Sequence, residues 1–79
     1  MARKEFAHYE AVSAVIPGTG GYSAAIAVKA LGAGGAPRFE RVLDDQTFKT
    51  ADDADQAAAQ KLEQLIDVDA EGQLHWQVI

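Results

Sequence analysis

The sequence contains no cysteine and only two histidines among its 79 residues. Without cysteine the chain can form neither disulfides nor thiolate zinc sites, and it has no cysteine nucleophile. This absence is typical of proteins in a reducing compartment, so we expect a cytoplasmic protein. A chain of this length buries only about 60–65% of the surface that its unfolded form exposes, so its stability should depend on good packing or on oligomerisation.

Long hydrophobic runs are also missing. A long uncharged stretch, residues 11–27, is interrupted by Pro17 and three glycines, so we expect no membrane-spanning helix. The first residues are charged and no apolar segment follows them, which argues against a targeting segment. With 48% hydrophobic residues the chain can nevertheless form a core, and its length corresponds to one domain, residues 1–79.

Basic residues are scarce. Seven lysines and arginines stand against twelve aspartates and glutamates, a formal net charge of −5 at pH 7. Residues 1–43 carry a net +2 and residues 44–71 a net −7. Tight non-specific nucleic-acid binding needs many contacts between basic side chains and phosphates, so this balance argues against it. One alternative function is binding of a basic partner by an acidic helix surface bearing Asp52, Asp53, Asp55 and Glu63.

Alternating small and apolar residues predict three strands. Residues 8–16 and 22–31 are separated by the sequence Pro-Gly-Thr-Gly-Gly, in which proline fixes φ and the glycines permit positive φ. These two runs therefore predict an antiparallel hairpin. A glycine-rich loop at residues 32–37 leads to a third strand at residues 38–43.

A helix is predicted at residues 50–66. Thr50 suits the N-cap, acidic residues follow in the first turn, and apolar residues then recur at three- and four-residue spacing. We expect Phe48 to be a buried anchor just before the helix, and residues 74–79 to form a short closing strand. The order β-β-β-α-β predicts an α+β fold, in which an antiparallel sheet of three to four strands packs on one helix.

Large side chains are few, with 8% aromatic residues, and we expect most of them in the core. The predicted core residues are Phe6, Tyr9, Ile26, Val28, Phe39, Phe48, Leu62, Leu65 and Trp76.

No catalytic arrangement can be assembled from the sequence. The glycine-rich turn at residues 17–21 lacks the Lys-Ser/Thr of a phosphate loop and precedes a strand. Ser13 and Ser23 lack a nucleophile-elbow context, and His8 and His75 would have to converge with a carboxylate to act. We therefore expect a protein that is not an enzyme and needs no cofactor.

The acidic segment at residues 67–72 is similar to the start of an EF-hand calcium loop. Asp67, Asp69 and Glu71 supply oxygen atoms at alternate positions, and Gly72 stands at the sixth position. The twelfth position is Val78, which cannot supply the bidentate carboxylate. We favour the alternative, an acidic turn into the last strand without a metal.

Two short motifs resemble a known family. GYSAAI at residues 21–26 enters the second strand and FKTADDA at residues 48–54 enters the helix. In this order they resemble the AP2-like domains at the N-termini of phage-type integrases, over about residues 20–66. The resemblance implies a sheet that lies in the major groove of DNA. A nucleic-acid role would then rest on Lys29, Arg38, Arg41 and Lys49, although the strands have fewer basic and aromatic residues than that family.

Small residues on the strands indicate a different function. We interpret Ala11, Ser13, Ala25 and Ala27 as one smooth face of the sheet. Such a face, or the edge strand, is suited to contact with another copy or another protein. The leading prediction is a non-enzymatic protein-interaction module that forms a homodimer. The alternative is that this face meets only solvent.

Overall fold

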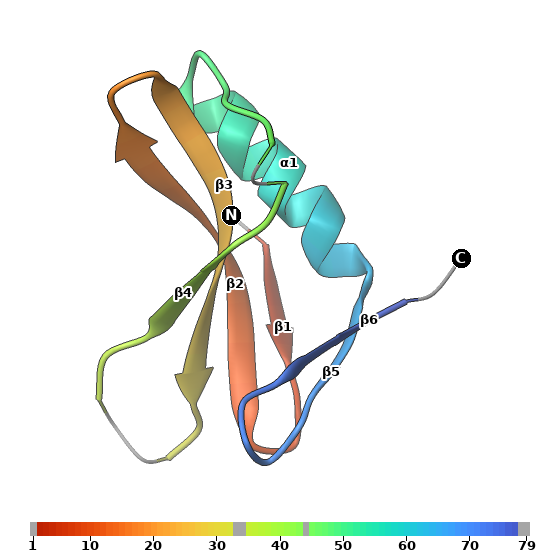
Figure 1. Cartoon of the computed structure of the whole chain (residues 1–79). Coiled ribbons are helices and arrows are strands. Elements are labelled where there is room, and N and C mark those ends of the chain that lie inside the picture. The colour runs from red at the N-terminus through yellow and green to blue at the C-terminus, as the bar shows by residue number, and fades with distance from the viewer. Residues whose placement is uncertain (1, 33–34, 44, 78–79) are drawn as a thin grey trace.

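The computed structural model describes residues 2–32, 35–43 and 45–77. Four antiparallel strands form the main sheet in the order β1-β2-β3-β4, and one helix lies across it (Figure 1). The main-sheet strands are β1 (Arg3–Glu5), β2 (Tyr9–Gly18), β3 (Gly21–Ala30) and β4 (Arg38–Arg41), and the helix is α1 (Ala51–Glu63). A second, two-stranded sheet consists of β5 (Leu65–Val68) and β6 (Leu74–Trp76). The predicted α+β fold is confirmed.

The hairpin of β2 and β3 forms the centre of the main sheet. Only two residues separate Gly18 from its partner Gly21, as the glycine-rich segment predicted. The prediction that β2 ends before Pro17 is wrong, because β2 continues to Gly18. Proline is tolerated there because it removes no hydrogen bond of the sheet. The N–H that it lacks would point to the side of β1, and among the described residues the segment of β1 pairs with β2 no further than Ser13.

Gly21 allows the segment before the helix to approach β3. Its φ is +133°, and a Cβ at this position would lie 2.5 Å from the carbonyl oxygen of Phe48. Tyr22 and Phe48 exchange two backbone hydrogen bonds of 2.8 Å. Phe48 is half-buried and packs against the core, so it holds this segment just before the helix as expected.

The helix begins as predicted and ends earlier. The Thr50 hydroxyl oxygen accepts a hydrogen bond of 3.1 Å from the N–H of Asp53, which confirms Thr50 as the N-cap. The predicted extension to residue 66 is wrong, because Gln64 caps the helix and β5 begins at Leu65. A register irregularity in β5 lets both Leu65 and Val68 remain buried.

The last predicted strand begins at Leu74 but belongs to the small sheet, where β6 pairs with β5. Residues 78 and 79 of that prediction lie outside the described residues. The fourth strand of the main sheet is instead β1, which the charged residues 3–5 did not indicate. β4 is shorter than predicted, and Leu43 just beyond it has a φ of 53° that is incompatible with a strand.

Small residues line the contact between α1 and the main sheet. Ala11 and Ala24 on the strands and Ala54 and Ala58 on the helix have no exposed surface. Larger side chains fill the space around them, and of the predicted core residues Ile26, Val28, Leu62 and Leu65 are buried, while Phe6, Tyr9, Phe48 and Trp76 are half-buried against the core. The prediction that Phe39 belongs to the core is wrong, since 54% of its surface is exposed.

Ser13 provides the polar link between the layers. Its buried hydroxyl donates a hydrogen bond of 2.8 Å to Asp55 Oδ1 on α1, and its oxygen accepts one of 2.9 Å from the N–H of Ala2. The serine therefore joins the helix to the chain beside β1.

Replacing Ser13 with alanine should lower the free energy of unfolding by about 1–2 kcal/mol, because the N–H of Ala2 and an oxygen of Asp55 lose their buried partner. Urea unfolding at pH 7 measures the change. Ser23→Ala is the matched control, since Ser23 is half-buried and its hydroxyl forms no hydrogen bond with the described residues. Equal effects of the two substitutions would contradict the role of Ser13.

Replacing Gly21 with alanine should destabilise the fold by about 2 kcal/mol, because alanine is strained at positive φ and its Cβ would collide with the Phe48 carbonyl. Gly20→Ala is the control, because a Cβ at Gly20 has no neighbour within 4 Å. Thermal unfolding followed by circular dichroism should show a clear decrease in Tm for Gly21→Ala only.

Candidate interaction surface

The pairing of β2 with β3 determines which residues share a face of the main sheet. Directly opposite residues lie on the same face of an antiparallel pair. Ala11 pairs with Val28 and Ser13 with Ile26, whereas Ala25 pairs with Ala14 and Ala27 with Val12.

The predicted small-residue face, Ala11, Ser13, Ala25 and Ala27, is therefore wrong. Ala11 and Ser13 are buried on the side of α1, and Ala25 and Ala27 lie on the opposite side. A shift of one residue in register exchanges the two faces of a strand, and the sequence pattern did not establish the register.

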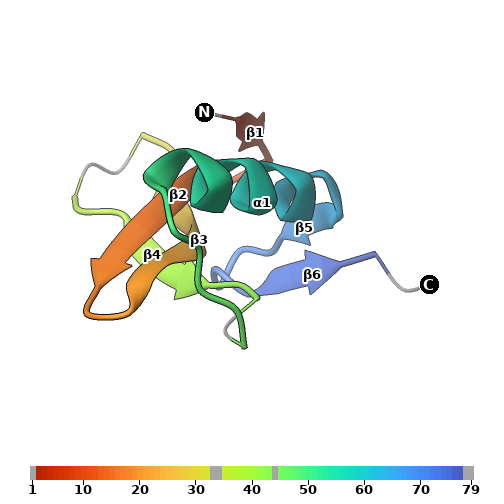
Figure 2. The ribbon, with the colours of Figure 1, turned by 90° about the horizontal axis from the view of Figure 1, so that it is seen from above.

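We call the side of the main sheet opposite α1 the open face. Viewed from above, α1 lies on one side of the sheet and no described helix or strand covers the other side (Figure 2). The shortest dimension of the molecule, 18 Å, matches one helix on one sheet. The apolar residues of the open face are Val12, Ala14, Ile16, Ala25, Ala27 and Phe39.

The centre of the open face consists of small apolar residues. Ala25 and Ala27 are 0% and 4% exposed, although no described helix or strand covers them. Phe39 lies directly across from Ala27 and is 54% exposed. An aromatic ring thus stands beside a floor of small residues.

Charged residues border this apolar centre. Arg3 donates a hydrogen bond of 2.7 Å from Nε to Glu10 and also forms an ion pair of 3.1 Å with Glu5. The hydrogen bond with Glu10 is the main reason that the pKa of Arg3 is raised. Lys29 and Arg41 are exposed and form no ion pair with the residues that the structure describes.

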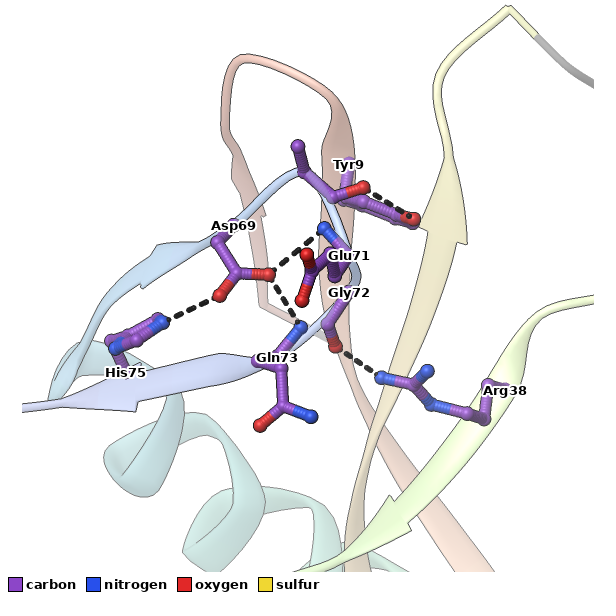
Figure 3. A network of polar contacts seen from close by, with 8 residues as sticks. Tyr9, Arg38, Asp69, Glu71, Gly72, Gln73 and His75 are labelled. Carbon is purple, nitrogen blue, oxygen red and sulfur yellow. Dashed lines mark hydrogen bonds and ion pairs between the residues drawn. The ribbon is translucent and has the colours of Figure 1, made fainter.

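The basic residues proposed for nucleic acid do not share one surface. Lys29 and Arg41 are on the open face, but Arg38 is on the face of α1. Arg38 pairs with Glu40 at 2.8 Å and donates a hydrogen bond to the carbonyl oxygen of Gly72 (Figure 3). Lys49 is exposed in the segment before α1.

The acidic residues of the helix are likewise divided. Asp52 and Asp53 are exposed in the first turn, and Glu63 is exposed at the last residue of the helix. Asp55 is half-buried and holds Ser13.

Asp69 organises the turn that resembled a calcium loop. Its Oδ1 accepts hydrogen bonds from the N–H groups of Glu71 at 2.9 Å and Gln73 at 3.0 Å, and its Oδ2 lies 2.9 Å from His75 Nε2 (Figure 3). These oxygens are engaged within the turn. Across residues 2–32, 35–43 and 45–77 no three His, Cys, Asp or Glu side chains are placed to hold a metal ion.

A cleft of about 560 Å³ lies between β4, the end of α1 and β6. Lys61 Nζ is 4.9 Å from the centre of the Trp76 ring, which is half-buried against the core. The cleft also contains Arg38 and Glu40, which pair with each other. Arg41, which forms no ion pair with the described residues, lines the cleft as well. The charged groups of the cleft are thus of both signs, which selects no ligand class.

Comparison of the chain with protein-family models, with curated protein sequences and with solved structures gave no match. Within the described part of the chain, no helix is long and apolar enough to cross a membrane. The open face is therefore interpreted from its own residues.

The Asp69 turn should become less stable in acid. The hydrogen bond with His75, followed by those from Gln73 and Glu71, holds the pKa of Asp69 below its ordinary value of 3.8. A carboxyl with a lowered pKa stabilises the fold when ionised, and this contribution is lost as the pH falls below 3.8 and through the folded pKa. Urea unfolding at pH 7 and pH 3 should show a smaller loss of stability for Asp69→Asn than for the wild type. An identical loss would contradict the role of Asp69.

Proposed function

We propose that this protein is a self-associating protein-interaction module that binds through the open face of its main sheet. The observation that carries the proposal is the exposed Phe39 beside the buried alanines Ala25 and Ala27, on a face that no described element covers. An exposed aromatic ring and adjacent small apolar residues suit an isologous contact, in which both copies bury the same surface.

Burial of the open face would use apolar surface that α1 leaves in water. Full burial of an exposed phenylalanine side chain contributes roughly 1.5–3 kcal/mol, so burying the 54% of Phe39 that is exposed contributes about half of this in each copy. Neighbouring valine and isoleucine side chains, Val12 and Ile16, would add to this.

The size of the open face predicts moderate affinity. Four strands spaced about 4.8 Å apart and about six residues long have a flat area of roughly 400 Å². Two such faces bury roughly 800 Å², which is below the roughly 1,000 Å² that stable specific interfaces exceed. We therefore expect dissociation constants in the high micromolar range.

Nucleic acid fits this face less well. Only two of its cations, Lys29 and Arg41, are without an ion pair among the described residues, and the chain as a whole has a net charge of −5. Affinity for nucleic acid scales with the number of phosphate contacts that basic residues make.

Phe39→Ser should weaken self-association at least tenfold, because the serine cannot fill the apolar contact. Sedimentation equilibrium between about 5 and 500 μM measures the dissociation constant. Ile66→Ser is the matched control, since Ile66 is 61% exposed but belongs to β5 of the small sheet. A wild-type protein that stays monomeric over this range, or equal weakening by both substitutions, would overturn the proposal.

A further inference from the structure

We infer that the two copies dock with their two-fold axis parallel to β2 and β3, so that β2 of each copy lies over β3 of the other. This inference rests on the proposed self-association through the open face and adds the orientation of the partner and the side chains that specify it.

Two rows of side chains cross the open face at right angles to the strands. In the first row, here called the charged row, Glu5 pairs with Glu10 and Glu10 with Lys29. In the second row, Arg3 pairs with Val12, Val12 with Ala27, and Ala27 with Phe39. At the β1 end, the charged row thus has the acidic Glu5 and the second row the basic Arg3. At the other end, the charged row has the basic Lys29 on β3 and the second row the aromatic Phe39 on β4.

Rotation about an axis parallel to the strands keeps each row in place and reverses the strand order. β1 then faces β4 of the partner, and β2 faces β3. In the charged row, Lys29 comes to lie over the partner's Glu10, and the contact occurs twice by symmetry. Lys29 has no ion pair in the described part of one chain, so the partner supplies the opposite charge.

The second row becomes complementary in the same arrangement. Arg3, whose guanidinium bonds Glu10 and Glu5 of its own chain, lies over the ring of the partner's Phe39, so that its alkyl stem meets the aromatic face. Between these ends, Val12 lies over the partner's Ala27, so that a larger side chain meets a smaller one. Sheets that pack face to face with nearly aligned strands, at about 30°, have this kind of interleaved contact.

An axis perpendicular to the strands gives a poorer match. It would place the charged row over the opposite end of the partner's face, where Ile16 pairs with Ser23. The ammonium of Lys29 would then lose water without gaining a charge of opposite sign, which is unfavourable.

Charge reversal tests this orientation in the full-length chain. Lys29→Glu alone and Glu10→Lys alone should each weaken homodimers roughly tenfold or more, because like charges then face each other twice. A mixture of the two variants should form a one-to-one heterodimer with close to wild-type affinity, and the double variant E10K/K29E should again form homodimers. Sedimentation equilibrium measures all four samples.

Lys49→Glu is the control for net charge, because it makes the same charge change outside the strands of the main sheet and should leave the dissociation constant unchanged. Lys29→Gln places no second glutamate beside Glu10, so it replaces K29E as the test variant if K29E fails to fold. It should weaken the dimer several-fold.

The outcomes separate the orientation from the proposed function. If the wild type dimerises and K29E and K29Q dimerise equally well, or if the mixed variants do not recover affinity, the orientation is overturned while self-association stands. If the wild type is monomeric up to 500 μM, the proposed function and this inference both fail.

Discussion

The two-residue turn between Gly18 and Gly21 sets the pairing of β2 with β3, and the faces of the main sheet depend on this pairing. It places Ser13 and Ile26 on the side of α1, and Val12 and Ala27 on the open face. Gly21 also allows Phe48 to pair with Tyr22, which positions the chain just before the N-cap of the helix. A different register would exchange the buried and exposed side chains of a whole strand.

The same register brings the helix close to the sheet. Ala11 and Ala24 face Ala54 and Ala58 across the core, and their small size lets α1 approach β2 and β3. Because alanines bury little area, larger residues such as Ile26 and Leu62 supply most of the apolar burial around them. The hydrogen bond between Ser13 and Asp55 satisfies the one buried polar side chain in this contact.

One helix covers only one side of a four-stranded sheet, and this is the physical origin of the open face. The small residues Ala25 and Ala27 and the exposed ring of Phe39 lie there because their strand positions alternate with those that face α1. Two residues that suggested other functions take part in contacts within the fold. Asp69 holds a turn, and Arg38 joins β4 to that turn through Gly72.

The sequence by itself determined the local elements: the hairpin, the N-cap at Thr50, the single helix and the α+β class all follow from turn residues, capping chemistry and periodicity. It did not determine β1, the end of the helix at Glu63, or the position of Phe39, because each depends on a partner distant in the chain. The predicted small-residue face was wrong for the same reason. Ala25 and Ala27 lie on the open face, whereas Ala11 and Ser13 lie under α1, and only the tertiary pairing of strands decides which alternate residues meet the helix.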